Sequence, residues 1–425
     1  MLFMALGRAR LQGLPVSTAM LYVVAGIIVG PWCMGWLRID PIRDARILEG
    51  ITEVGIMVSL FVAGLKLRTR LHDRLWLPPI KLATVAMAIT IGMVAAFVHF
   101  VFGMDWGVSV LLGAMLAPTD PVLASDVQVE DTEDRDKLRF SLTGESALND
   151  GTAFPVVLLG LGLMGRHELG AGGWRWLTVD LLWATSAGLL VGWGTGNLFA
   201  RLTLWFRKKR CETNSTDDYL SVGLIALSCG LALILQANGF LAVFAAGLAL
   251  RHTELNSTAD GKTPKEAIEG AETGKEVHDT QSAPAYMAEV AQAFTEALEH
   301  ILEFGIVMLL GAMLPWAEFS WRSLGLALAV FLVFRPLAVA ISLVGERLGK
   351  TRRRLISWFG IRGVGLIFYL SFAITHGIPE GVAKELTGLV FAVIVASLVA
   401  HGITVTPLIQ RYEERFARKK PAVAS

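Results

Sequence analysis

Charged side chains are scarce in this sequence. Only 18% of its 425 residues are Asp, Glu, Lys or Arg, and 54% are hydrophobic. Soluble domains carry about 25% charged residues, and the mean hydropathy here is +0.55. This scarcity excludes an ordinary soluble domain and indicates a polytopic membrane protein.

Cysteine and net charge are also low. The three cysteines, Cys33, Cys211 and Cys229, are odd in number and lack the spacing of a metal site. We therefore expect small buried or loop residues at these positions. The net charge is +1, and no basic stripe stands clear of the loops, which argues against a nucleic-acid partner.

Apolar runs of about 20 residues are long enough to cross a bilayer. Such runs predict an all-α membrane protein with spans at 15–31, 50–66, 79–102, 106–127, 139–165, 176–200, 219–236, 239–250, 298–316, 323–345, 355–376 and 386–409. Residues 1–7 are apolar but too few to span, and Arg8 and Arg10 follow at once. We interpret residues 1–7 as the end of a truncated first helix, which gives about 12–13 transmembrane helices.

Lysine and arginine cluster in alternate connections between these spans, for example at 66–74, 135–139, 207–210 and 350–354, and in the tail. By the positive-inside tendency these connections and the C-terminus are cytoplasmic, and we expect a bacterial inner (plasma) membrane. The polar insertion from Thr253 to Ala293 falls on the same side. Its first part is predicted to be disordered, and a surface helix is predicted from Tyr286 to His300. The insertion is either a tolerated linker or a regulatory element.

Asp120 lies in the sequence Pro118-Thr119-Asp120-Pro121, inside an otherwise apolar run. An ionisable group at bilayer depth costs at least about 2.5–3.5 kcal/mol and is a functional-site hypothesis by default. The two prolines predict a broken helix. Broken helices at membrane depth form cation sites in transporters. Asp120 can cap a half-helix; the alternative is a simple proline kink.

The next predicted span carries Glu145, Ser146, Asn149 and Asp150. In a helix, Glu145 and Asn149 share one face, and Ser146 and Asp150 share the adjoining one. The Ser146 hydroxyl and the Asp150 carboxylate are hard oxygen ligands suited to a small cation. Desolvation favours the neutral form of a buried carboxyl group, so Asp150 is our candidate for a group that takes either a proton or a metal ion.

Glu145 requires a cationic partner, because an unpaired buried charge costs far more than a paired one. We predict that Arg362 is this partner, since it lies mid-span among glycines that favour a loosened helix. The alternative is an arginine that snorkels toward the cytoplasmic end. For Arg335 we predict a structural ion pair with Glu303 or Glu299.

These residues together resemble the monovalent cation:proton antiporter family, which contains bacterial NhaP-type and animal sodium/proton exchangers. The matching stretches are Thr-Asp-Pro at 119–121, Gly-Glu-Ser-x-x-Asn-Asp at 144–150, Gly-Phe-Leu-Ala-Val at 239–243 and Gly-Ile-Arg-Gly at 360–363. The span order agrees over nearly the whole chain. Any one motif is weak, but their joint occurrence in order is specific.

The resemblance implies an inverted-repeat fold with crossing broken helices, and a core domain that moves against a dimerisation domain in a homodimer. The implied boundaries are 1–78 and 166–316 for the dimerisation side, with its polar loop at 253–293, 79–165 and 317–409 for the core, and 410–425 for a cytoplasmic tail. It further implies that Asp150 binds cation and proton competitively. The remaining implied roles are cation co-ligands at Ser146 and Thr119, an ion pair between Glu145 and Arg362, and support of the crossover by Asp120 and Asn149.

The implied function is exchange of sodium or lithium for protons. Family members with Asn149-Asp150, as here, are expected to be electroneutral, whereas an Asp-Asp pair would suggest electrogenic exchange. No cofactor is implied, and the expected partners are Na⁺, Li⁺ or K⁺, protons, membrane lipid and a second copy of the chain. Many bacterial relatives have a glutamate in a Phe-Glu-Gly-Gly-Leu stretch, where this sequence has Val62. Potassium exchange is therefore kept as an alternative.

Two other classes of protein are alternatives. An intramembrane aspartyl protease would use Asp120 and Asp150, but the Gly-x-Gly-Asp motif of such enzymes does not occur in the sequence. We therefore expect no enzymatic activity. A cation channel without proton coupling would show ion flux that does not depend on a pH gradient.

Overall fold

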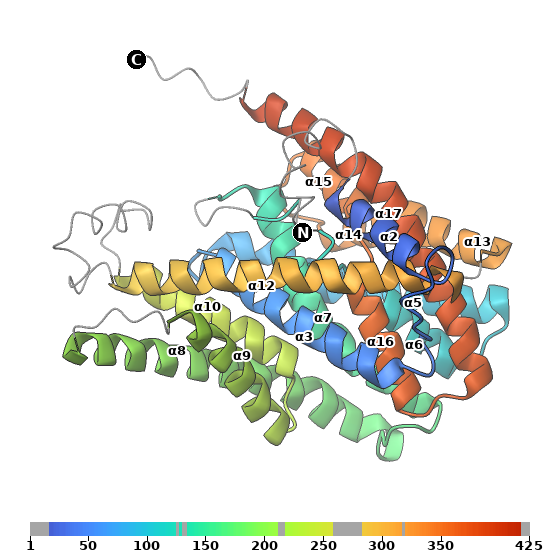
Figure 1. Ribbon diagram of the computed structural model, residues 1–425, viewed down its shortest axis with the longest axis horizontal. Helices are drawn as coiled ribbons and strands as arrows, with labels where there is room; N and C mark the ends of the chain where they lie inside the picture. The colour runs from blue at the N-terminus through green and yellow to red at the C-terminus, as the bar shows by residue number, and fades with distance from the viewer. Residues whose placement is uncertain are drawn as a thin grey trace.

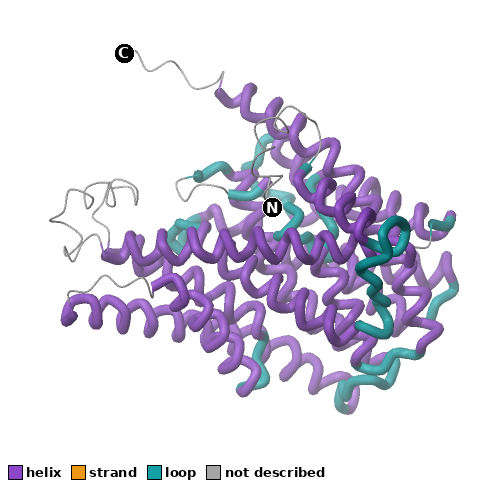
Figure 2. Tube along the Cα trace, in the orientation of Figure 1, coloured by secondary structure: helices purple, strands orange, loops and turns teal. Residues whose placement is uncertain are grey.

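The computed structural model describes residues 17–124, 127–129, 134–210, 217–257, 283–316 and 319–417. Within these ranges every regular element is helical (Figure 2). In chain order the elements are α2 (Thr18–Val29), α3 (Ala45–Lys66), η1 (Arg74–Trp76), α4 (Leu77–Lys81), η2 (Leu82–Ala86), α5 (Met87–Phe97), η3 (Val98–Phe102), α6 (Trp106–Leu116), α7 (Lys137–Leu163), η5 (Ala171–Gly173), η6 (Trp176–Trp183), α8 (Ala184–Arg210), α9 (Asp217–Ile234), α10 (Gly239–Ser257), α12 (Ala283–Met313), η7 (Leu314–Trp316), α13 (Trp321–Ala329), η8 (Val330–Phe334), α14 (Arg335–Ser342), α15 (Lys350–Trp358), α16 (Val364–Thr375) and α17 (Glu380–Ala417).

Most predicted spans correspond to one helix or to consecutive helical segments, but the span predicted at 106–127 is helical only in α6, up to Leu116, and is non-helical from Ala117 to Ala124. The span predicted at 79–102 is the run from α4 to η3, and the span at 323–345 is the run from α13 to α14. Seven of the described helical runs are long and apolar enough to cross a membrane. Large apolar side chains such as Phe100 and Leu190 are 75% and 72% exposed, as expected where a surface faces lipid rather than water.

The predicted boundaries differ from the structure beside the polar insertion. Helix α10 ends at Ser257 rather than near 250, so the first residues predicted to be disordered are helical. The predicted surface helix at 286–300 is part of α12, which begins at Ala283 and continues into the span. Residues 258–282, and the predicted helix remnant at 1–7, lie outside the described residues.

Two helices begin with side-chain caps that their sequences supply. The Asp136 carboxylate accepts hydrogen bonds from the N–H groups of Leu138 (2.8 Å) and Arg139 (3.4 Å) at the start of α7. Ser320 and Ser323 cap the start of α13 reciprocally. Such caps satisfy N–H groups that have no partner inside the helix.

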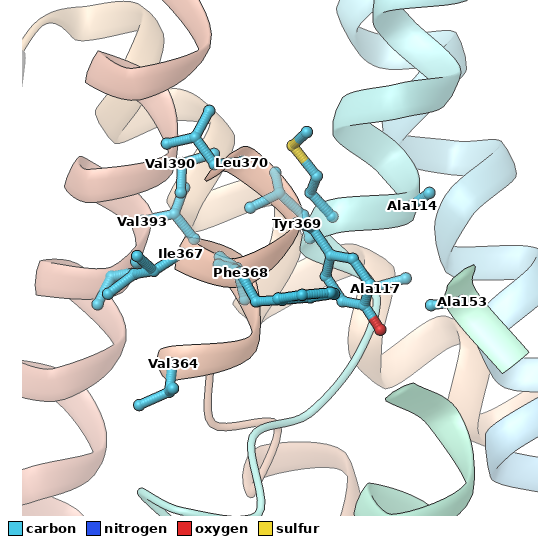
Figure 3. Packing of buried hydrophobic residues seen from close by; sticks show 14 of the residues in the cluster. Ala114, Ala117, Ala153, Val364, Ile367, Phe368, Tyr369, Leu370, Val390 and Val393 are labelled. Carbon is cyan, nitrogen blue, oxygen red and sulfur yellow. The ribbon is translucent and has the colours of Figure 1, made fainter. Parts of the chain in front are cut away.

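The core is built around α16. Its residues from Val364 to Ser371 are all buried, which is typical of a helix surrounded by other helices. Helix α16 contacts α3, α6, α7 and α17, and Figure 3 shows its Ile367 beside Val393 of α17. In Figure 1, α8, α9 and α10 lie together on one side of the molecule, and α14, α15 and α17 lie on the other. The buried α16 thus brings the second half of the chain against α6 and α7.

Candidate functional site

Two interrupted helices meet at the centre of the molecule. The first is non-helical after α6, from Ala117 to Ala124, and the second between α15 and α16, at residues 359–363. The N–H of Asp120 donates to the carbonyl of Ile361 at 2.9 Å. The breaks predicted around Thr119 and around Arg362 are therefore both present, and they lie against each other. We call this contact, between residues 117–124 and 359–363, the crossover.

Asp120 connects the two breaks through its side chain. One carboxylate oxygen accepts a hydrogen bond from the N–H of Val122 at 2.9 Å, and the other accepts one from the N–H of Val364, the first residue of α16. A carboxylate at this position is favoured by the positive end of the helix dipole. Only glycine fits at 363, because a Cβ there would overlap Asp120 Oδ2. The carboxylate thus caps a half-helix that belongs to the other interrupted segment.

Two further backbone groups, one in the second break and one beside it, have partners on α17. The N–H of Arg362 donates to Ser397 Oγ at 2.8 Å, and His401 Nε2 lies 2.8 Å from the carbonyl of Trp358. Non-helical backbone at membrane depth is tolerated only when the protein satisfies it in this way.

Gln128 stabilises the first break, although no sequence motif pointed to it. Its amide donates to the carbonyl of Pro121 at 3.1 Å and to Ser146 Oγ at 3.1 Å. Next to it, the N–H of Val129 donates to Thr143 Oγ1 at 2.9 Å. These contacts hold the broken segment against α7. Nothing in the local sequence distinguishes Gln128 from the polar linker that follows it.

Asn149 and Thr119 are brought together across the two segments. The Asn149 amide donates to Thr119 Oγ1 at 2.8 Å, and Asn149 Oδ1 has no hydrogen-bond partner within the described residues. Ser146 Oγ donates to the carbonyl of Thr143 at 3.1 Å and accepts from Gln128. The Thr119 hydroxyl of the first break therefore lies against the part of α7 that carries Ser146 and Asn149.

Asp150 is the most unusual member of this group. Its side chain is 1% exposed, and in the described part of the chain neither carboxylate oxygen has a hydrogen-bond partner. It faces the first turn of α16, where a Cβ built on Gly365 would lie 3.3 Å from Asp150 Oδ1. Its backbone carbonyl accepts a hydrogen bond from the Tyr369 hydroxyl at 2.6 Å, and Figure 3 shows this hydroxyl near Ala117 and Ala153. A buried carboxylate without a donor is costly unless a cation or a proton compensates it.

Helix α7 is loosened just after Asp150. Pro155 has no N–H, so the carbonyl of Gly151 loses its partner within the helix. The Asn238 amide, next to the start of α10, donates to this carbonyl at 2.7 Å. The Pro155 carbonyl in turn accepts from Trp176 Nε1 at 2.7 Å. Residues 151–155, just after Asp150, are thus held by side chains from two other parts of the chain.

The predicted pair of Glu145 with Arg362 is wrong. Glu145 forms a buried two-point ion pair with Arg335, in which Nη1 donates to Oε1 and Nη2 donates to Oε2 at 2.8 Å. Arg335 begins α14, whose first turns pack against α15 and the η2 segment beside α7. From there it reaches α7, whereas the backbone of Arg362 is held toward Ser397.

The predicted partners of Arg335 are therefore also wrong. Glu303 lies 3.5 Å from His300 Nδ1, and Glu299 accepts a hydrogen bond from Ser59 on α3. Both glutamates lie on α12, away from the ion pair of Glu145 with Arg335.

Arg362 is fully buried, and in the described part of the chain none of its three guanidinium nitrogens has a hydrogen-bond partner. It acts electrostatically on Asp120, Asp150 and Glu145 without forming an ion pair within the described residues. Its charge thus offsets part of the negative charge of the crossover from a distance.

This arrangement can bind a small cation or a proton. It offers an unpaired carboxylate together with amide and hydroxyl oxygens, which suit hard cations. Crossing broken helices around such a group are the architecture of a secondary transporter. The fold and the site therefore define an integral membrane protein of the transporter class.

The family follows from comparison with known proteins. The model of the family described as "Sodium/hydrogen exchanger, transmembrane" matches residues 1–411. This chain belongs to the sodium/hydrogen exchanger family.

Similar curated proteins include antiporters of two ions. The chain is 26% identical over 379 residues to Na(+)/H(+) antiporter 2 of Zygosaccharomyces rouxii, covering 84% of this chain and 42% of that protein. It is 23% identical over 401 residues to the K(+)/H(+) antiporter NhaP of Alkalimonas amylolytica, covering 92% of this chain and 61% of that protein. The chain thus spans less than two thirds of the length of these relatives.

The fold also matches solved structures. The sodium proton antiporter MjNhaP1 from Methanocaldococcus jannaschii at pH 8 aligns with a TM-score of 0.65 at 20% identity, covering 98% of this chain and 95% of that one. A three-dimensional electron microscopy map of the same antiporter gives a TM-score of 0.69 at 18% identity. The predicted antiporter fold is confirmed.

Proposed function

We propose that this protein exchanges a monovalent cation for protons across the membrane, and that Asp150 is the carboxylate that takes either one. The observation that carries the proposal is the environment of Asp150. Its two oxygens are buried and unpaired within the described residues, and they face the start of α16. A proton and a cation would relieve the same unpaired charge, so binding of one excludes the other.

The charge balance of the crossover favours a one-for-one exchange. Three carboxylates, of Asp120, Glu145 and Asp150, stand against two guanidinium groups, of Arg335 and Arg362. The cluster therefore carries one net negative charge when all five groups are ionised. One cation or one proton at Asp150 neutralises it, and the neighbouring Asn149 adds no charge. Exchange is therefore electroneutral in this proposal.

The co-ligands in this proposal are Thr119 and Ser146. Each hydroxyl oxygen has two lone pairs, and each accepts one hydrogen bond, from Asn149 and Gln128 respectively. One lone pair on each oxygen is left for the cation. We propose sodium or lithium as the cation. Potassium is the second candidate, because Val62 is a buried apolar residue on α3 and cannot act as a ligand.

We also propose how the protein is oriented in the membrane and how it assembles. The lysine- and arginine-rich connections and the C-terminus would lie in the cytoplasm of a bacterial cell. The core segments, 79–165 and 317–409, contain both interrupted helices and would move against the remaining helices in a homodimer. This movement would expose Asp150 alternately to the two sides of the membrane.

Proton flux in inside-out vesicles tests the proposal. Sodium, lithium or potassium is added to vesicles that hold a pH gradient, over a range of pH and with the membrane potential clamped at two values. We expect at least one cation to collapse the gradient, at a rate that does not depend on the potential. Exchange that depends on the potential would refute electroneutrality, and cation flux without proton movement would favour a channel.

A further inference from the structure

A hollow of about 360 Å³ lies outside the crossover, between the η8–α14 segment and α15. Its walls are mostly apolar and include Phe331, Leu332, Val339 and Trp358. Two arginines, Arg353 and Arg354, complete the lining at one end. None of the described residues that line it is acidic.

The apolar part opens on a surface that faces lipid. Leu332 is 56% exposed, and on the same run of helix Leu337 and Ile341 are each 47% exposed. From Phe331 to Ala340 the helical run rises about 14 Å. This length is close to half of a hydrocarbon core of about 30 Å. The hollow therefore has the depth of one leaflet.

Within the described residues, no carboxylate pairs with the arginines at the cationic end of the hollow. Arg353 and Arg354 lie in the first half of α15, near the end where the helix dipole is positive and further cations are unfavourable. Neither forms an ion pair within the described residues, and Arg353 Nε is buried there without a hydrogen-bond partner. Arg353 Nη2 donates a hydrogen bond to the carbonyl of Glu346 at 2.7 Å.

Two carboxylates that belong to this region of the described chain, Glu346 and Asp136, have other partners. The Glu346 side chain pairs with Lys81 at 2.5 Å. On α15 itself, Arg352 pairs with Asp136 at 3.0 Å. Arg353 and Arg354 are the cations among the described residues that line the hollow, so an external anion there would meet them.

We propose that this hollow binds an anionic phospholipid from the cytoplasmic leaflet. One acyl chain lies against Phe331, Leu332 and Trp358, and the phosphate contacts Arg353 and Arg354. Anionic headgroups attract lysine and arginine near the membrane surface. A neutral lipid would leave the two arginines uncompensated, and a free phosphate would leave the apolar wall uncovered.

Such a lipid would contact the helices that hold the crossover. Pro336, in the wall of the hollow, follows Arg335, and Arg335 Nη2 donates to the carbonyl of Ile356 on α15 at 3.1 Å. Trp358, also in the wall, is the last residue of α15 before the break. The lipid would therefore brace α14 against α15 next to the segment that contains Arg362.

Direct lipid binding tests this proposal, independently of transport. Fluorescent phosphatidylglycerol or phosphatidylcholine is titrated into the purified full chain in neutral detergent. We expect the chain to prefer phosphatidylglycerol. R353A/R354A should weaken phosphatidylglycerol binding about thirtyfold, since each arginine near a headgroup contributes about a fivefold factor. Its phosphatidylcholine binding should not change. The matched control is R411A/R415A, which removes two exposed arginines from α17 and should leave the preference intact.

A second pair of variants tests the apolar wall without changing charge. Ala340→Trp fills the hollow and should weaken phosphatidylglycerol binding at least tenfold, about 1.4 kcal/mol. Leu337→Trp, on the exposed face of the same helix, should not. Equal binding of the two lipids, or phosphatidylglycerol binding that survives R353A/R354A in a monodisperse protein, would overturn the proposal. Full displacement of the lipid by equimolar inorganic phosphate would also overturn it, because the apolar wall would then contribute nothing.

Discussion

Removal of Arg335 should destabilise this protein more than removal of any other arginine near the crossover. In the ion pair of Arg335 with Glu145 the two side chains are 3% and 2% exposed, and both carboxylate oxygens accept hydrogen bonds from the guanidinium. Arg335→Ala leaves Glu145 as an uncompensated buried charge. Breaking such a pair costs about 3–5 kcal/mol. Arg362 has no hydrogen-bond partner in the described part of the chain, so Arg362→Ala should cost clearly less.

The free energy of unfolding can be compared by denaturant titration of the purified variants in one detergent, with the apparent melting temperature as a second measure. The double variant Glu145→Leu/Arg335→Met provides the matched control. Apolar residues of similar volume replace both charges, and such replacements are often neutral or stabilising. The double variant should therefore recover most of the loss. Equal losses for Arg335→Ala and Arg362→Ala, or a double variant as unstable as the single one, would refute the pairing.

Two further variants test the crossover and the ion preference. Gly363→Ala introduces a Cβ that overlaps the Asp120 carboxylate and should lower the free energy of unfolding by about 1–3 kcal/mol in the same titration. Gly381→Ala, whose Cβ meets open space at the start of α17, should leave it unchanged. Equal effects of the two variants would argue against the close approach of Gly363 to Asp120. Val62→Glu adds a carboxylate to α3 and should raise the apparent affinity for sodium in the vesicle assay, with Val62→Gln as the uncharged control. An unchanged affinity would show that α3 does not reach the ion.

Much of the fold follows from local sequence. Apolar runs of sufficient length predict the spans, and the prolines around Asp120 predict the first break because they remove helical hydrogen bonds. The glycines around Arg362 predict the second break in the same local way. Local sequence does not show that the two breaks lie against each other, because the contact of Asp120 with Val364 joins residues 244 positions apart.

The error over the partner of Glu145 has a similar cause. Arg335 and Arg362 are both arginines in apolar surroundings, and charge alone does not rank them. The difference arises from helix packing, which directs Arg335 toward α7 and leaves the Arg362 side chain without a partner in the described part of the chain. Gln128 was missed for the same reason, since its partners depend on how the broken segment folds back.

The central claim, that Asp150 takes a proton and a cation in competition, is tested most directly by the pH dependence of the apparent cation affinity in proteoliposomes. Competition at a single carboxylate predicts that the affinity falls as the pH falls, approaching about tenfold per pH unit in the acid range. Asp150→Asn should abolish exchange in a folded protein, while Asp105→Asn, at an exposed helix end, should behave like the unmodified chain. An affinity that does not change with pH, or proton-coupled exchange that persists in Asp150→Asn, would contradict the claim.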